Sequence, residues 1–281
     1  EEMAGARASR KILWGFLPIG VLQAAFFFIP LAVMVLYSLW KAEGVRVVPD
    51  WTLRNYANLF TTRMYILTLL KTGGISLLVT LLALLFGYPF AFFLVRYVRK
   101  QWQIPLLMLV IIPFCTNLVI RTYAWRLILA HQLPFARLAA LLGLIPEGTS
   151  LQPSTFAVYI GMVSSFLPFA ALPLYTSVER MDWSIVEAAQ DLYASRLRIF
   201  FQAILPQTLP GLVVAVILTF IPAMGVFVVP DLLGGAKYML VGNLIQQQFG
   251  QSRDWPFGAA VSLALMILTL AGLLLLRKRG D

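Results

Sequence analysis

Long apolar segments separated by polar connections are the dominant pattern of this chain. Six of them reach the length of about 20 residues that an α-helix needs to cross a bilayer. They are Ile12–Trp40, Ile66–Val95, Ile104–Leu129, Ser154–Thr176, Thr208–Leu232 and Pro256–Leu276. Helical spacing predicts two shorter helices in the connections, Thr52–Phe60 and Pro134–Leu144. The pattern therefore predicts an all-α integral membrane protein with six transmembrane helices in a single domain, residues 1–281.

Prolines lie in several of the predicted spans, and in two of these spans they mark an expected interruption. Pro113, followed by the polar pair Thr116 and Asn117, divides the third span, and Pro222 and Pro230 lie in the fifth. Bent or interrupted helices often line the pathway of a transporter. We therefore expect these two spans to be bent or broken.

The stretch Ser184–Gly211 is charged and amphipathic, unlike the rest of the chain. Ser184 and Glu187 fit a capping box, in which each side chain bonds the backbone N–H of the other residue. This pair predicts a short helix over Ile185–Leu192. One face of this helix would carry apolar residues at helical spacing, namely Ile185, Ala188, Ala189 and Leu192. Such a stretch is either a loop lying on the membrane surface or a rigid element that docks a soluble partner.

A second helix is expected in the same stretch. Ser195 is placed to cap a helix from Arg196 to about Leu205. Pro206 and Pro210 are expected to end it before the next span. Two short helices joined by a turn would form a protruding knob between two spans.

Composition supports a membrane location. Of the 281 residues, 60% are hydrophobic and only 12% charged, and the mean hydropathy is +0.84. Soluble domains average about a quarter charged residues. The net charge of +10 arises from 22 basic and 12 acidic residues. The basic residues cluster at the ends of spans, so anionic membrane lipid explains them better than nucleic acid does.

The basic clusters also predict the orientation. An even number of spans places both termini on one side of the membrane. That side holds two dense clusters, Arg96–Lys100 and Arg277–Arg279, whereas the basic residues of the other side are dispersed along long connections. The positive-inside rule therefore predicts that both termini and the stretch Ser184–Gly211 are cytoplasmic.

One acidic residue, Asp231, falls inside an apolar span, near its periplasmic end. An ionisable residue at membrane depth usually faces a polar cavity, so Asp231 is either a pathway residue that attracts a cation or a cap at the membrane interface. Phe227, four residues earlier, either serves the pathway, by closing it or by holding an ammonium group through a cation–π contact, or packs between helices. Thr116 and Asn117 are candidates for neutral polar contacts with the substrate.

Several kinds of chemistry have no motif in this sequence. There is no G-x-x-x-x-G-K-[ST] phosphate loop and no H-E-x-x-H or Cys/His metal-ligand spacing. His131 is the only histidine and Cys115 the only cysteine. The sequence thus predicts no catalytic, metal or cofactor site in this chain, and a membrane enzyme is the weaker class.

The 184–211 stretch resembles a motif of a known family. E-A-A at Glu187–Ala189, followed by Asp191, Ala194-Ser195, Ile204–Pro206 and Pro210-Gly211, is similar to the EAA loop of bacterial ABC-importer permeases. The resemblance implies a type I importer permease fold, in which this loop forms coupling helices that dock into a cytoplasmic ATPase. The implied coupling residues are Glu187, Ala188, Ala189, Asp191, Leu192 and Tyr193. The family usually has Gly where this chain has Tyr193, so the shape of the turn stays open.

A narrower resemblance spans most of the chain. The motifs are G-Y-P-F-A at Gly87–Ala91, P-F-C-T-N-L-V-I-R at Pro113–Arg121, P-A-M-G-V-F at Pro222–Phe227, G-G-A-K at Gly234–Lys237 and D-W-P-F-G-A-A at Asp254–Ala260. They resemble the permeases of spermidine/putrescine importers.

This second resemblance implies a bacterial inner-membrane permease subunit that forms half of a pathway for polyamines or a related small organic cation. The implied partners are a second permease subunit, a cytoplasmic ATPase dimer that binds ATP and Mg, and a periplasmic substrate-binding protein. An importer of another solute, such as an amino-acid-like compound, stays open as an alternative. A passive channel is a further alternative, although a channel needs no ATPase-docking element.

Overall fold

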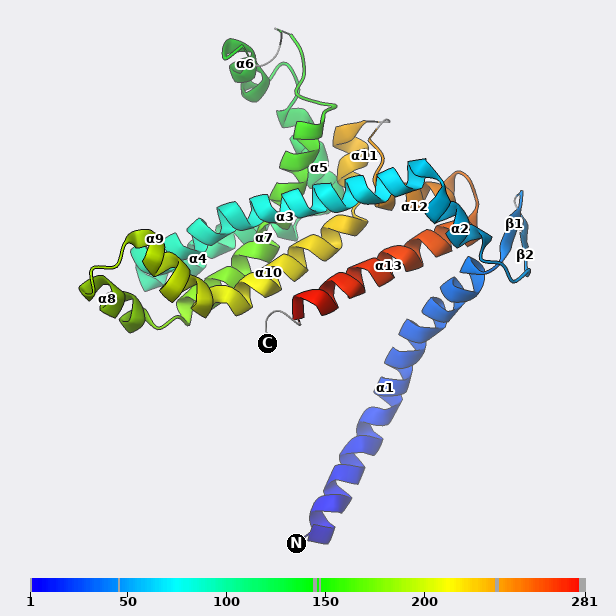
Figure 1. The fold of residues 1–281 in the computed structure, drawn as a ribbon, viewed down its shortest axis with the longest axis horizontal. Helices are drawn as coiled ribbons and strands as arrows, with labels where there is room; N and C mark the ends of the chain where they lie inside the picture. The colour runs from blue at the N-terminus through cyan, green and yellow to red at the C-terminus, as the bar shows by residue number, and fades with distance from the viewer. Residues whose placement is uncertain (1, 45, 144–145, 147, 236–237, 278–281) are drawn as a thin grey trace. The chain divides into compact units, whose positions relative to one another are not determined.

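The computed structural model describes residues 2–44, 46–143, 146, 148–235 and 238–277 (Figure 1). Leu144, at the end of one predicted helix, and Lys278 and Arg279, in one predicted basic cluster, lie outside the described residues. In chain order the elements are α1 Glu2–Ser38, β1 Lys41–Glu43, β2 Arg46–Val48, α2 Arg54–Thr61, α3 Arg63–Tyr97, α4 Lys100–Ile111, η1 Ile112–Cys115, α5 Leu118–Ile128, α6 Pro134–Leu141, α7 Thr155–Glu179, α8 Trp183–Asp191, α9 Arg196–Ile199, η2 Phe200–Ile204, α10 Leu205–Gly225, α11 Val228–Gly234, α12 Val241–Gly250 and α13 Trp255–Arg277.

Each of the six predicted spans has a counterpart among the described residues. Five are helices long and apolar enough to cross a membrane: Pro18–Ser38, Arg63–Tyr97, Thr155–Glu179, Arg196–Gly225 and Trp255–Gly272. The third predicted span is a pair of helical segments, Lys100–Cys115 and Leu118–Ile128, that meet at a bend of 97°. The bend falls at Pro113–Asn117, where the sequence predicts an interruption. The predicted six-span helical class is confirmed.

One small element departs from a purely helical fold. Strands β1 and β2 pair antiparallel, with Lys41 opposite Val48 and Glu43 opposite Arg46. Gly44, between the strands, has a φ of 63°, which glycine adopts without strain. Lys41 Nζ donates to Glu43 Oε1 at 2.8 Å. This hairpin of three-residue strands is too short for a hydrophobic pattern to reveal it.

The chain divides into two compact units. One contains the described residues up to Thr62 together with Gln247–Met266. In it, α2 is held to the end of α1 by Asn55, whose Nδ2 donates to the carbonyls of Ser38 at 2.9 Å and Trp40 at 2.8 Å. The other unit contains the described residues from Arg63 to Gln246 and from Ile267 onward.

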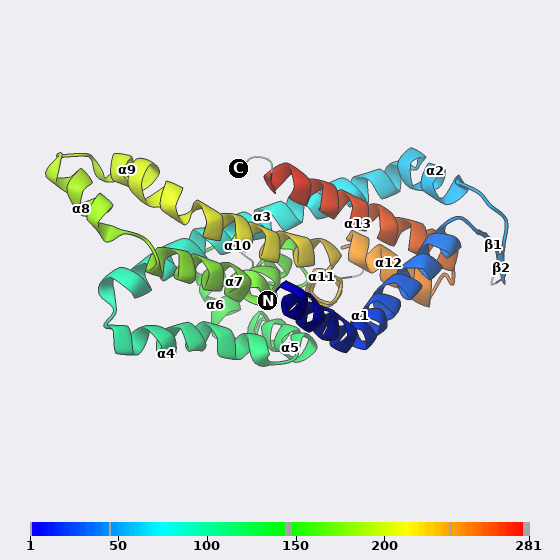
Figure 2. The same ribbon diagram turned by 90° about the horizontal axis from the view of Figure 1, so that it is seen from below.

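The larger unit is built on α7, which packs against both α3 and α10 (Figures 1 and 2). One cluster of buried side chains includes Val79 of α3, Met162 of α7 and Val229 of α11. A second includes Leu94 of α3 and Leu174 of α7. These apolar contacts join the three long helices along their length.

The two ends of this unit carry different structures. Helices α8 and α9 lie at one end of α7 and α10, and α5 and α11 lie at the other (Figures 1 and 2). Glu179 ends α7 beside α8, whereas Gly161 near its start faces Val229 and Leu233 of α11. The predicted loop and the predicted pathway residues are therefore at opposite ends of the same helices.

Candidate functional site

The first helix of the 184–211 loop begins two residues earlier than predicted, and the predicted capping box is wrong. Helix α8 starts at Trp183, and Asp182 is its N-cap, accepting a bond from the Ser184 N–H at 2.9 Å. Hydrogen bonds from Ser184 hold the pKa of the Asp182 carboxyl below its ordinary value. The Asp182 N–H donates to Gln207 Oε1 at 2.9 Å, so a residue of α10 fixes this start. Glu187 lies exposed in the second turn and caps nothing.

The turn between the two helices has the left-handed geometry that the sequence left open. Tyr193 has a φ of 55°, the conformation that a glycine would adopt without strain. The turn is closed by the Leu192 N–H bonding the Ala188 carbonyl and the Ala194 N–H bonding the Ala189 carbonyl, each at 3.1 Å. The Tyr193 side chain is 97% exposed. Its ring therefore packs against nothing else in the described chain.

The second helix begins as predicted but does not end at the prolines. Ser195 caps it, with its Oγ accepting a bond from the Arg198 N–H at 3.4 Å. The helix then runs through the π-helical turn η2 into α10 and ends at Gly225. A π-turn is wider than an α-turn, so it makes room for the ring of Pro206. It also accommodates the backbone carbonyl one turn earlier, which receives no hydrogen bond because proline has no N–H.

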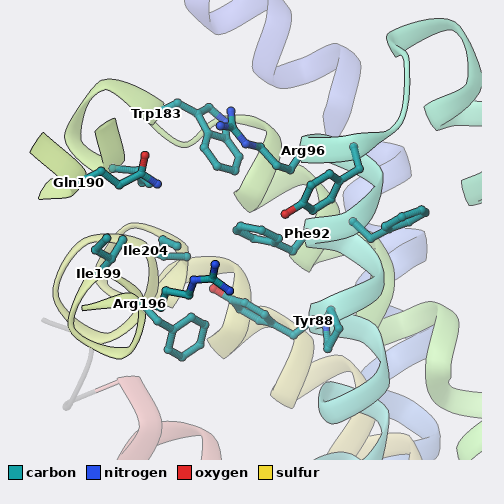
Figure 3. A pocket seen from close by; sticks show the side chains of 13 residues that line it. Tyr88, Phe92, Arg96, Trp183, Gln190, Arg196, Ile199 and Ile204 are labelled. Atoms are coloured by element: carbon teal, nitrogen blue, oxygen red, sulfur yellow. The ribbon is translucent and has the colours of Figure 1, made fainter. Parts of the chain in front are cut away.

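A small core fixes this loop to the membrane helix α3. Val186 of α8 and Ile199 of α9 are buried together. The Trp183 ring lies 5.6 Å from that of Phe92 (Figure 3). The Phe200 ring lies 5.7 Å from that of Tyr88. The loop is thus packed on α3 through aliphatic and aromatic contacts.

The opposite face of the loop is apolar and exposed. Leu192 is 81% exposed and Leu197 73%, and Ile185 is also exposed. Among the predicted coupling residues, Glu187, Ala188, Asp191, Leu192 and Tyr193 are exposed and Ala189 is half-buried. An apolar face that the described chain leaves uncovered is typical of a docking surface.

The predicted interruption of the fifth span is present. Helix α10 ends at Gly225 and α11 begins at Val228, so Val226 and Phe227 form the break. The Asp231 N–H bonds the Phe227 carbonyl at 3.0 Å, which puts the two residues one helical turn apart. Both side chains are exposed. The break presents a carboxylate and an aromatic ring on the surface of this unit.

Three residues that hold this break were missed in the sequence. Asn243 Nδ2 donates to the Phe227 carbonyl at 3.0 Å. A Cβ on Gly242 would lie 2.6 Å from the Gly225 carbonyl oxygen, so only glycine lets α12 approach so closely. Thr72 Oγ1 accepts a bond from the Val241 N–H at 2.9 Å, which ties α12 to α3. Nothing local in the sequence marks these residues, because their partners are distant in the chain.

Thr116 and Asn117 lie at the other bend. Asn117 caps α5, with its side-chain oxygen accepting from the Val119 N–H at 2.8 Å, and Thr116 Oγ1 donates to the Pro113 carbonyl at 2.6 Å. Helix α5 packs against α11, so both bends belong to the same end of the unit. In the described chain no hydrogen bond joins Asp231 to either residue, and no cluster of His, Cys, Asp or Glu could hold a metal ion.

Comparison with known proteins gives relatives across most of the chain. PotB, the spermidine/putrescine transport system permease protein of Escherichia coli (strain K12), is 43% identical over 235 residues, which are 84% of this chain and 83% of that protein. PotB of Haemophilus influenzae is 41% identical over 217 residues, 77% of this chain and 75% of that protein. The inner membrane ABC transporter permease protein YdcU of Escherichia coli is 29% identical over 245 residues, which are 83% of this chain and 78% of that protein.

Solved structures and a family profile agree with these relatives. A bacterial ABC transporter involved in the import of the acidic polysaccharide alginate matches with a TM-score of 0.68 at 15% identity, covering 100% of this chain and 98% of that one. The alginate transporter in complex with an alginate pentasaccharide-bound periplasmic protein gives a TM-score of 0.73, also at 15% identity. Both show the fold. Residues 81–277 match the family profile, so this chain belongs to the family of binding-protein-dependent transport system inner membrane components.

Proposed function

We propose that this chain is the permease subunit of an ATP-driven importer and forms half of a pathway for polyamines. The proposal rests on one observation above all, the loop that joins α7 to α10, packs on α3 and turns an exposed apolar face away from it. A passive channel has no use for such a surface. The polyamine substrate is supported by the 43% identity with the spermidine/putrescine permease PotB. A second permease subunit would complete the pathway.

The loop would be the contact with the ATPase. Leu192 and Tyr193 at its tip would enter a groove of a cytoplasmic ATPase, which binds ATP and Mg, while Glu187 and Asp191 contribute charged contacts beside them. This orientation places both termini in the cytoplasm. The ring contacts of Trp183 and Phe200 with α3 would carry a movement of the ATPase into the membrane helices. Hydrolysis itself would then belong to the partner, because this chain has no phosphate loop.

The break at Val226–Phe227 would form the gate, at the far end of the same helices. A polyamine loses hydration water on passing a narrow gate, and a carboxylate there offsets part of that cost with a charge-assisted hydrogen bond. Asp231 is exposed one turn beyond Phe227 and has the required charge. Thr116 and Asn117 would add neutral contacts from the other bend. A periplasmic binding protein would deliver the substrate to this end.

The test is uptake of labelled spermidine into proteoliposomes that hold the complete transport complex. Asp231→Asn keeps the side-chain shape and removes the charge. A charged hydrogen bond is worth about 1.5–3 kcal/mol, so uptake efficiency should fall roughly 10- to 100-fold. Asp50→Asn, also at an exposed acid, is the matched control and should leave uptake unchanged. Equal uptake in the two variants would remove Asp231 from the pathway. Transport of a neutral solute but not spermidine by the unaltered complex would overturn the polyamine assignment.

A further inference from the structure

A hollow of about 620 Å³ lies between the last turns of α3 and the 184–211 loop (Figure 3). Its walls come from α3, α8, α9 and η2. A volume of this size is in the range of small-molecule sites, about 300–1,000 Å³. It is separate from the exposed tip of the loop and from the break at Phe227, so neither proposed site accounts for it.

Two arginines give the hollow a positive charge. Arg96 of α3 and Arg196 of α9 both line it, and its lining contains no acidic residue. The Arg96 guanidinium lies over the Trp183 ring, 5.0 Å from its centre, which holds the cation in place. Figure 3 shows Arg96 beside Trp183 on one side of the hollow and Arg196 beside Tyr88 on the other. Among the described residues the one ion pair joins Lys41 to Glu43, so neither arginine is neutralised.

The rest of the lining is apolar and aromatic. Phe92 lies between the two arginines in Figure 3, and Val186, Ile199 and Ile204 are buried side chains of the loop that also line the hollow. Tyr and Trp side chains are typical of the headgroup level of a membrane, where one part of the ring is wet and the other apolar. The ligand that fits therefore has an anionic head and an apolar body.

We propose that this hollow binds one anionic phospholipid from the cytoplasmic leaflet. Its phosphate would lie between Arg96 and Arg196, and its glycerol and first acyl carbons would cover Phe92 and Ile204. The leaflet follows from the proposed function, which makes the loop cytoplasmic. A soluble anion would leave the apolar wall in water, and the ATPase would contact the outward-facing Leu192 and Tyr193 instead. A lipid held here would join the loop to α3 and make coupling depend on membrane composition.

The test counts lipid on the complete purified chain by mass spectrometry of the intact protein, after equilibration with phosphatidylglycerol or phosphatidylcholine. One phosphatidylglycerol should stay bound and phosphatidylcholine should not. The double variant Arg96→Gln with Arg196→Gln should weaken phosphatidylglycerol retention roughly 10- to 30-fold. The matched control is Arg99→Gln with Arg198→Gln, at two arginines that are exposed but lie outside the hollow. This control should change retention less than about twofold. Lysine at both hollow positions should retain most of the binding.

Four results would overturn the proposal. Equal losses in the two glutamine pairs would mean general attraction to a basic surface. Release of the lipid by inorganic phosphate alone would mean an anion site, and release on addition of the ATPase would assign the hollow to that partner. Equal retention of the two lipids by the unaltered chain would exclude an anionic site even if a variant failed to fold. Spermidine uptake is not part of this readout, so lipid binding and the proposed transport function fail or stand separately.

Discussion

At the scale of single residues, Tyr193 decides the shape of the loop tip. Its φ of 55° turns the chain between α8 and α9, and its ring is 97% exposed. An ordinary L-residue in this conformation costs about 1–2 kcal/mol, and a β-branched residue costs more. Tyr193 thus combines a strained backbone with a side chain that the described chain does not use, which is consistent with a contact in the assembled complex.

Substitution of Tyr193 separates the role of its backbone in the turn from the role of its exposed side chain. Tyr193→Gly should keep the turn and raise the free energy of unfolding of the purified chain by about 0.5 kcal/mol. The relief of backbone strain in the folded state exceeds the cost of the larger conformational entropy that glycine has in the unfolded state. Tyr193→Val should lower stability by about 1 kcal/mol. Tyr193→Gly should nevertheless weaken ATPase binding, because the ring is lost. Thermal unfolding in detergent and an ATPase pull-down measure the two effects, and a glycine variant less stable than the valine variant would contradict the assigned geometry.

The residue that starts α8 illustrates what the sequence does not decide. Asp182 and Ser184 are both good N-cap residues, and Ser184 has a carboxylate three positions later. Asp182 is the actual cap, and its N–H is bonded to Gln207 on α10, 25 residues away in the chain. A tertiary contact therefore selects between two local options. Ser195 caps α9 as it was predicted to do, and Asn117 caps α5 although Thr116, the residue before it, is also a good cap residue.

At the scale of elements, Gly211 sets how closely α10 approaches α7. A Cβ at this position would overlap the Ser177 side chain and lie 2.8 Å from the Pro173 carbonyl oxygen. The contact is just beyond the loop, where α10 and the end of α7 run together. This close approach leaves no room for a larger side chain at this position.

Adding one methyl group at Gly211 tests that packing. Gly211→Ala should destabilise the chain by about 1–3 kcal/mol, because backbone and side chain must both shift. Gly73→Ala is the control, since Gly73 is also inside a helix but a methyl group added there would meet nothing within 4 Å. At Gly73 the better helix propensity of alanine should leave the free energy of unfolding unchanged or raise it by up to about 1 kcal/mol. Similar thermal stability of the two variants would contradict the described contact between α7 and α10.

Breaks between elements were predictable where proline or polar pairs mark them. The bend at Pro113–Asn117 falls at such residues, whereas the break before Val228 lies between Pro222 and Pro230 and at neither of them. Pro206 gave the wrong prediction, because a π-turn absorbs a proline without ending the helix and has no sequence pattern of its own. The residues that pin the second break, Asn243 and Thr72, act across long sequence separations.

At the scale of the whole molecule, hydropathy alone predicted where the spans lie. The apolar length of a span is a local property, so each predicted segment was found. Packing between spans is not local, and the hollow beside Arg96 depends on residues from four elements that no single stretch reveals. The EAA resemblance indicated where to expect a docking element, and the structure adds that this element packs on α3.

The most direct test of coupling measures spermidine uptake and ATP hydrolysis together in proteoliposomes containing the complete complex. Glu187→Lys reverses a charge on the exposed face of α8 without removing a cap or a buried contact. Uptake and substrate-stimulated hydrolysis should both fall at least about 10-fold, as expected for a lost interfacial charge contact of about 2 kcal/mol. Asp50→Lys, the same reversal at an exposed residue outside the loop, should leave both rates unchanged. Normal, ATP-dependent uptake in the Glu187→Lys complex would contradict the role of the loop as the contact with the ATPase.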